Sequence, residues 1–151
     1  MASSGSRCDE GRRPEAAQSN HEGHEGTKGA REELAAHAVI GAAIEVHRIL
    51  GPGYLESVYE SALAVELTLR GISFARQHPF SLDYKGHPVG EGRVDLLIAE
   101  CLPVELKTVD IVAPIHRAQL LSYLKALRLP LGLLLNFKAP TLRDGIVRVV
   151  L

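Results

Sequence analysis

The chain has 151 residues, of which 46% are apolar, and its formal net charge at pH 7 is −1. A chain of this length forms one domain with a real hydrophobic core, and the balance of charge does not favour a protein built for long nucleic-acid contacts. No apolar run approaches the roughly 20 residues that span a bilayer. The two cysteines, Cys8 and Cys101, lie far apart, so we expect a cytoplasmic protein without a structural disulfide and without membrane association.

Residues 1–30 are rich in Gly, Ser, Glu and Arg and contain almost no large apolar side chain. Such a segment cannot bury enough surface to offset the entropy of ordering it, so we predict a disordered, low-complexity tail. The tail repeats His-Glu-Gly at residues 21–26, which is typical of a low-complexity segment rather than of a metal site. One folded domain is therefore predicted over residues 31–151.

Two helices are predicted at the start of this domain, from about Glu32 to Leu50 and from about Tyr54 to Arg70. The breaker sequence Gly-Pro-Gly at residues 51–53 separates them. In the second helix, apolar residues recur at helical spacing and form a stripe that we expect to face the core. The residues of this stripe are Leu55, Val58, Ala62, Val65 and Leu69.

Strands are predicted next. Ile72 to Tyr84 is extended, as one strand or two, and a turn follows at residues 85–88. Val94–Ala99 and Leu102–Lys107 are short strands, and Asp95 ends the polar turn that leads into the first of them.

The C-terminal part adds a third helix, from about Ala113 to Arg128, with Pro114 suited to its first turn. The apolar run Leu131–Phe137 suits a central strand that is covered on both faces, and Ile146–Leu151 suits a final strand. This order of elements predicts an α/β fold with a small mixed β-sheet flanked by α-helices.

The most informative polar groups are Asp95 and, ten residues later, the segment Glu105-Leu106-Lys107. Side chains alternate along a strand, so Glu105 and Lys107 share a face, and a hairpin would bring Asp95 beside them. Charges are rarely placed in such a position unless they pair or hold a metal. A hard cation such as Mg²⁺ needs only one or two carboxylates besides its waters. From spacing alone, metal chemistry and a charge-paired sheet edge both stay open.

Three helix residues are further candidates. Glu56 borders the packed face of the second helix, because Tyr59 and Leu63 follow at i+3 and i+7. Gln119 and Tyr123 are i and i+4 on the third helix and so lie on one face. Taken alone, these patterns are also typical of a surface carboxylate near a helix N-terminus and of a packing pair.

Several motifs occur together in one chain. They are Gly53-Tyr54-Leu55-Glu56-Ser57-Val58-Tyr59, Arg93-Val94-Asp95-Leu96-Leu97, Val104-Glu105-Leu106-Lys107, Gln119-Leu120-Leu121-Ser122-Tyr123-Leu124 and Leu135-Asn136-Phe137. With these motifs, over about Glu33 to Leu151, the chain resembles the GxxExxY family, a branch of the PD-(D/E)XK nuclease superfamily. One feature departs from the superfamily pattern: the proline that often precedes the first acid is absent, because Arg93-Val94 stands before Asp95.

The resemblance implies a restriction-endonuclease-like core with the site at the end of a central hairpin. It implies that Asp95 and Glu105 are metal ligands and that Lys107 is the catalytic lysine. Glu56 would join the metal shell and take part in catalysis, and Gln119 and Tyr123 would line the site. We expect the carboxyl groups of the three acids to gather within roughly 4–6 Å of one another around one cation.

The function implied is a Mg²⁺-dependent nuclease, with Mn²⁺ as the alternative metal, that hydrolyses phosphodiester bonds in DNA or RNA. Candidate phosphate contacts are Arg93, His116, Arg117 and Lys125. The competing hypothesis is a non-catalytic module on the same scaffold that binds nucleic acid or protein. A homodimer is a further expectation, because a core of this size usually needs a partner to hold a duplex.

Overall fold

The computed structural model describes residues 25–151. The first 24 residues of the predicted tail, with most of its His-Glu-Gly repeat, lie outside the described residues. Nine elements follow one another: α1 (Glu25–Leu50), α2 (Glu56–Leu69), β1 (Phe74–Tyr84), β2 (His87–Ile98), β3 (Leu102–Lys107), α3 (Pro114–Leu127), β4 (Leu131–Asn136), the 3-10 helix η1 (Leu142–Gly145) and β5 (Ile146–Val150). Helix α1 begins at Glu25, within the stretch of residues 1–30 that we predict as a tail.

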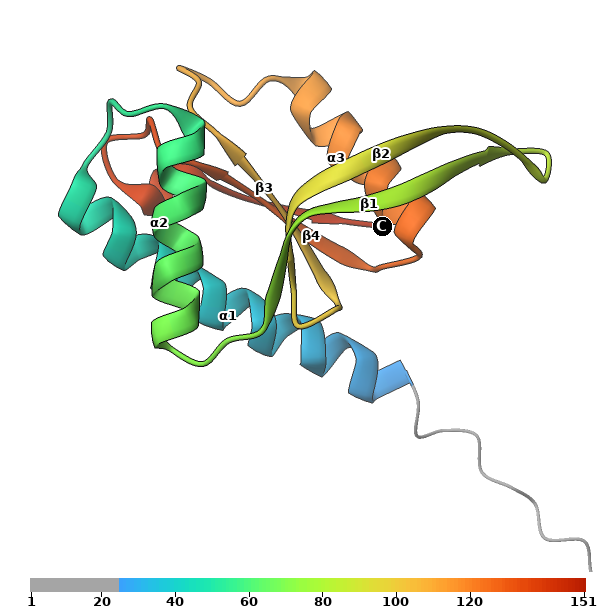
Figure 1. Cartoon of the computed structure of the whole chain (residues 1–151), viewed down its shortest axis with the longest axis horizontal. Coiled ribbons are helices and arrows are strands. Elements are labelled where there is room, and N and C mark those ends of the chain that lie inside the picture. Colours follow the sequence, from blue (N-terminus) through green and yellow to red (C-terminus); the bar gives the residue numbers. More distant parts are fainter. Residues whose placement is uncertain (1–24) are drawn as a thin grey trace, which may run out of the picture.

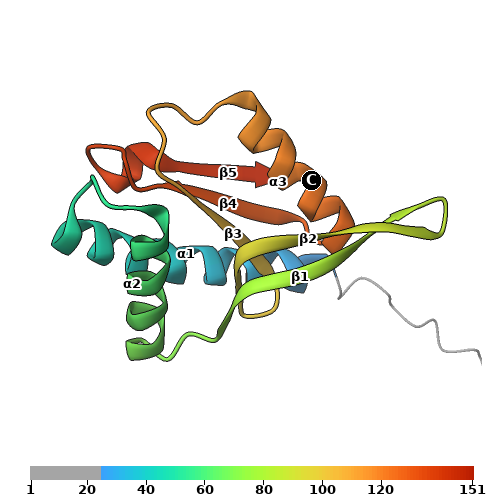
Figure 2. The same cartoon turned by 45° about the horizontal axis from the view of Figure 1, so that its top comes forward.

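The five strands form one sheet in the order β1-β2-β3-β4-β5. Only the β3–β4 pair is parallel, and the other neighbouring pairs are antiparallel. Helices α1 and α2 cover one face of the sheet, and α3 covers the other (Figures 1 and 2). The predicted α/β class, a small mixed sheet flanked by helices, is therefore confirmed.

The core between α1, α2 and the sheet is built on small residues of α1 and large ones of α2. Alanine and valine side chains of α1 let the helix approach closely, and Tyr59 of α2 stacks on Phe137 with ring centroids 4.5 Å apart. Strand β4 is buried along its whole length, as predicted for a central strand. Cys101 is a buried free thiol, and no helix within residues 25–151 is long and apolar enough to cross a membrane.

The apolar stripe predicted for the core side of α2 faces solvent instead. Leu55 and Leu69 are each 76% exposed, whereas Tyr59, Leu63 and Leu67 are fully buried. Helix α2 is apolar on two sides, and the side that carries the large Tyr59 ring packs on the sheet. The consequence for function is that Glu56, at i−3 from Tyr59 and i−7 from Leu63, lies on the inward side of the helix.

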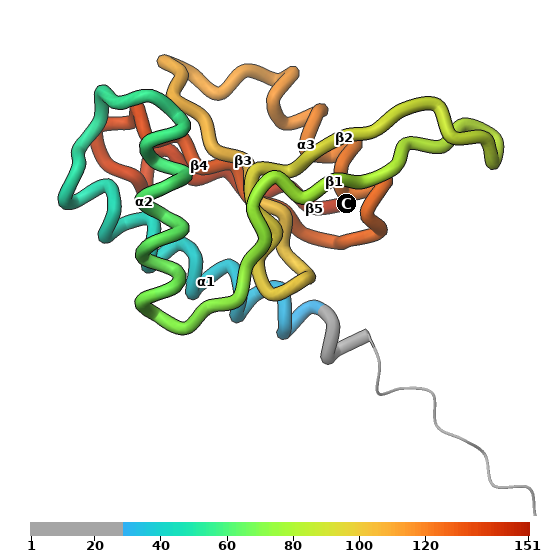
Figure 3. Tube along the Cα trace, viewed as in Figure 1, coloured from blue at the N-terminus to red at the C-terminus, as the bar shows by residue number. Residues whose placement is uncertain are grey.

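Strand β2 begins at His87, seven residues before the predicted strand, so Asp95 lies inside a strand and not at the end of a polar turn. The outer half of the β1–β2 hairpin projects beyond the rest of the sheet (Figure 3). The hairpin turns at Lys85 and Gly86, which both have positive φ and so form the tight turn that suits two twisted strands.

Candidate active site

The candidate site lies where β2 and β3 separate. Ladder pairing between these strands runs from Ile98↔Leu102 to Leu96↔Val104 and stops there. Beyond that point, side chains replace the ladder. The backbone N–H of Leu106 donates to Asp95 Oδ2 at 2.8 Å, and the backbone N–H of Asp95 donates to Glu105 Oε1 at 3.0 Å. The two acids therefore hold the open end of the hairpin.

Asp95 and Glu105 place two carboxyl groups side by side. Glu105 is buried, with only 6% of its surface exposed, whereas Asp95 is half-buried. Burial, and next the charge of Asp95, raise the pKa of Glu105 from its ordinary value of 4.5 to about 8. The N–H group of Asp95 and the charge of Lys107 act in the opposite direction but are smaller effects. Glu105 therefore keeps its proton near neutral pH when no cation other than Lys107 is beside it.

Glu56 reaches the same region from α2. It is the first residue of the helix, and its inward position follows from the packing of Tyr59. The Tyr59 hydroxyl donates to Gly51 O at 2.5 Å and accepts the Tyr54 N–H at 3.3 Å, so it fastens the turn that precedes Glu56. Partial burial, and then the charge of Asp95, raise the pKa of Glu56, and Lys107 opposes this shift.

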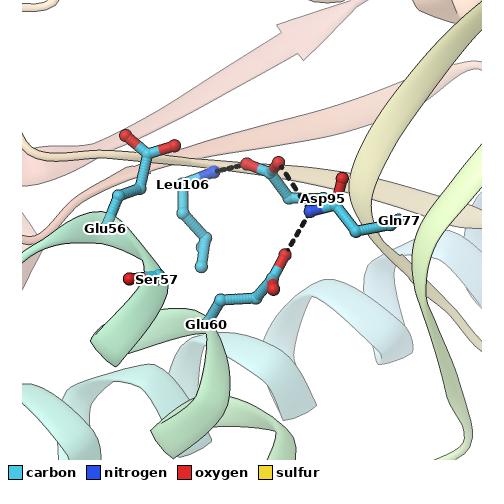
Figure 4. Close-up of a pocket in the computed structure, with 6 residues that line it drawn as sticks. All are labelled: Glu56, Ser57, Glu60, Gln77, Asp95 and Leu106. Atoms are coloured by element: carbon cyan, nitrogen blue, oxygen red, sulfur yellow. Dashed lines mark hydrogen bonds between the residues drawn. The ribbon is translucent and has the colours of Figure 1, made fainter.

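Glu56 and Asp95 line a common pocket of about 300 Å³. Figure 4 shows that α2 supplies one wall of this pocket and the β1–β2 hairpin the other. Its six lining residues are Glu56, Ser57, Glu60, Gln77, Asp95 and Leu106. The pocket is therefore acidic and can accept a cation or a polar ligand that carries one.

Lys107 is the last residue of β3 and is half-buried. Its Cα is in register with Asn136 of β4, whose buried side chain donates to Val109 O at 2.8 Å and accepts the Val109 N–H at 3.1 Å. Asn136 therefore fixes the chain just after Lys107. No hydrogen bond or ion pair holds the Lys107 ammonium group within residues 25–151, so this group is available to a ligand.

The two predicted residues of α3 lie differently. Tyr123 is half-buried and packs edge-on against Phe80, with ring centroids 4.9 Å apart. Burial, and then the charges of Glu105 and Asp95, raise the pKa of Tyr123. Gln119 is exposed, and neither Gln119 nor Tyr123 lines the pocket that contains Asp95.

None of the four predicted phosphate contacts lines the pocket that contains Asp95. Arg93 is exposed on β2, two residues from Asp95, and Arg117 and Lys125 are exposed on α3. His116 caps α3, because its Nδ1 accepts the Ala113 N–H at 3.1 Å.

The site's donors are hard carboxylate oxygens, which suit Mg²⁺ or Mn²⁺. Asp95 and Glu105 each use one oxygen for a backbone N–H and keep a second oxygen that can face a cation. The expected gathering of three acids is not found: among the described residues, no three His, Cys, Asp or Glu side chains are arranged to hold a metal ion. Because Mg²⁺ keeps several waters, the Asp95–Glu105 pair still fits it.

Two residues of the pocket were missed from the sequence. Glu60 follows Glu56 at i+4, so the helical spacing was a signal that could have found it. No sequence pattern indicates Gln77 as a site residue. Its side chain reaches the pocket because its backbone has a positive φ and is not paired with β2, and the sequence does not predict this conformation.

The family model described as the PD-(D/E)XK nuclease superfamily matches residues 33–149. No curated protein and no solved structure gives a significant match. The open mixed sheet with helices on both faces agrees with this match, and the fold is a small α/β fold of the restriction-endonuclease-like kind.

Proposed function

Because the chain belongs to the PD-(D/E)XK nuclease superfamily, we propose that it is a divalent-metal-dependent nuclease that hydrolyses phosphodiester bonds in DNA or RNA. The observation that carries this proposal is the buried Glu105 carboxyl group held against Asp95 and beside Lys107. A buried carboxyl group that retains a proton near neutrality is a costly arrangement unless a cation takes the place of that proton.

Asp95 and Glu105 would hold Mg²⁺ or Mn²⁺ through the oxygens that they do not use for backbone N–H groups. When bound, such a cation lowers the pKa of a coordinated water and offsets negative charge on a phosphate. The Lys107 ammonium group orients the attacking water or stabilises charge that develops on the phosphoryl oxygens. Glu56, whose carboxyl pKa is raised, would accept at one of its oxygens the proton that the attacking water loses.

Within the superfamily, we infer that the chain is of the GxxExxY type. The structure gives the motif a physical role that supports this inference. The buried Tyr59 fastens the Gly51–Tyr54 turn and thereby sets Glu56 at the start of α2, facing the pocket. The tyrosine of the motif thus acts through the position of its glutamate.

Nucleic acid is the proposed partner, with DNA as the first candidate. Arg93, Arg117 and Lys125 are exposed and can contact phosphates, and His116 can do so through Nε2 because Nδ1 caps α3. A homodimer and a cytoplasmic location stay predictions. Sedimentation equilibrium with and without a DNA duplex tests the dimer.

The experiment is incubation of the full chain with labelled single- and double-stranded DNA and RNA in Mg²⁺, Mn²⁺ or a chelator. We expect cleavage only with metal, and Asp95→Ala and Lys107→Ala should abolish it while the protein stays folded. Asp95→Asn is the sharper variant, because its amide oxygen can still accept the Leu106 N–H. Glu100→Gly, in the turn at the far end of β2, is the control and should cut normally.

Metal titration separates this function from the competing one. A nuclease should bind Mg²⁺ or Mn²⁺ through Asp95 and Glu105, and Glu105→Gln should weaken that binding. A chain with no metal affinity at millimolar ion, and no cleavage, would instead be a non-catalytic binding module on a nuclease scaffold.

A further inference from the structure

Strand β1 has an unusual backbone at Gln77. Its φ is 48°, in the left-handed region that residues other than glycine, asparagine and aspartate seldom adopt. The ladder pairs Arg76 with Leu96 and His78 with Val94, and leaves Gln77 and Asp95 opposite each other without a pairing. A strained residue in the middle of a strand and beside a candidate site calls for a functional explanation.

The break changes which way the side chains point. In a regular strand, neighbouring side chains alternate between faces. Here Arg76 and Gln77 are neighbours, yet both reach the Glu60 carboxylate: Arg76 Nη2 lies 3.0 Å from Oε2, and Gln77 Nε2 donates to Oε1 at 2.5 Å. The left-handed conformation thus turns the Gln77 side chain into the pocket.

Strand β2 switches faces at the same level. Val94 packs in the cluster under α3, whereas Leu96, two residues later, packs in the core under α1 and α2. Two residues that should share a face are on opposite faces, so the hairpin twists sharply at Asp95. Gln77 lies opposite Asp95 at this twist, and its Nε2 also donates to Asp95 Oδ1 at 3.4 Å (Figure 4).

The Asp95 carboxylate is therefore held from two sides. Leu106 N–H fixes Oδ2 at 2.8 Å, and the Gln77 amide lies against Oδ1. The Gln77 amide is in turn held by Glu60, whose side chain is only 13% exposed and whose charge is balanced by Arg76. Gln77 is itself exposed, so burial does not account for its strained backbone.

We propose that Gln77 is a positioning residue that fixes the Asp95 carboxylate for cation binding, and that Glu60 and Arg76 hold Gln77 for this purpose. The proposal rests on the proposed function, because it concerns the same carboxylate. Partners that orient a metal ligand typically change metal affinity or activity by roughly 10–100-fold when they are removed.

The first test is Mn²⁺ binding to the full chain by calorimetry. Gln77→Gly keeps the left-handed backbone and removes the amide, so Mn²⁺ affinity should fall roughly 10–100-fold while the fold is retained. Glu100→Gly is the matched control, since Glu100 also has a positive φ, of 59°, and should leave the affinity unchanged. Equal Mn²⁺ affinity in the parent and Gln77→Gly would overturn the proposal.

A second measurement works without metal and separates this proposal from the proposed function. Hydrogen exchange of the Leu106 amide reports whether Asp95 is in place, because that N–H donates to Asp95 Oδ2. Gln77→Gly should speed this exchange about tenfold and leave the Phe137 amide, which donates to Lys107 O, unchanged. A parent protein without Mn²⁺ binding or cleavage would refute the nuclease, whereas an unchanged Leu106 rate would refute the role of Gln77.

Glu60 is tested through its coupling to Gln77. If Glu60 acts by holding the Gln77 amide, then Glu60→Ala should weaken Mn²⁺ binding in the parent and have little further effect in Gln77→Gly. Independent, additive losses in the double variant would show that Glu60 does not act through Gln77.

Discussion

Replacement of Glu105 by glutamine should stabilise the metal-free protein at neutral and alkaline pH. The glutamine keeps an oxygen that can accept the Asp95 N–H and removes the buried like charge. In the folded protein the pKa of Glu105 is about 8, against an ordinary value of 4.5. Between these two values the folded chain holds a proton that the unfolded chain has released, so the free energy of unfolding of the parent falls as pH rises.

The size of the effect follows from the two pKa values. Each pH unit between them costs about 1.4 kcal/mol at most, so this one group removes about 3 kcal/mol between pH 5 and pH 7.5. The variant lacks the group and should lose none of that amount. Its advantage over the parent should therefore grow by about 3 kcal/mol between pH 5 and pH 7.5.

Urea unfolding in the presence of a chelator, from pH 5 to pH 8, measures this difference. Glu100→Gln removes an exposed carboxylate of the same type and should show no growing advantage. A difference in the free energy of unfolding between parent and Glu105→Gln that stays constant across this range would show that Glu105 does not retain a proton in the folded protein. Addition of Mg²⁺ should reduce the difference in free energy of unfolding between Glu105→Gln and the parent, because the cation replaces the proton in the parent only.

Three further variants test how the site is built, each by its denaturation midpoint. Tyr59→Phe loses the hydrogen bond to Gly51 O and should lower the free energy of unfolding by about 1–2 kcal/mol. It should also reduce cleavage, because the turn that sets Glu56 at the start of α2 is no longer held. Asn136→Ala leaves two backbone N–H groups without their acceptor and should cost roughly 2–3 kcal/mol. Gly92→Ala would place its Cβ 2.2 Å from a ring carbon of Phe80 and should cost about 1–3 kcal/mol, and a midpoint equal to the parent's would show that the ring moves freely.

Most elements of the fold followed from local patterns. Leu131–Asn136 is a continuous apolar run, and a fully buried central strand is the structure that such a run favours. Pro114 begins α3, because a proline at the first helical position loses no hydrogen bond. The hairpin that brings Asp95 to Glu105 was likewise predictable, since period-two spacing and a short turn decide it.

What the sequence did not indicate depends on tertiary packing. The periodicity of α2 allows two apolar sides, and only the stacking of Tyr59 on Phe137 decides which is buried. The packing of Tyr59 on Phe137 also turns Glu56, three residues earlier on α2, toward the pocket. The gathering of three acids was not found because spacing along a chain does not fix the directions of side chains. The left-handed Gln77 is a further case, since its conformation is held by Glu60 and Asp95 and not by its own preference.

The open end of the β2–β3 hairpin has a consequence for tracing activity through evolution. Asp95 and Glu105 each accept a backbone N–H there, so both side chains serve the hairpin as well as the proposed chemistry. A descendant that has lost hydrolysis can still keep an oxygen acceptor at each of these positions for the hairpin alone. Lys107, whose ammonium group supports no described contact, would be free to drift, and its retention is thus the better sign of a working enzyme.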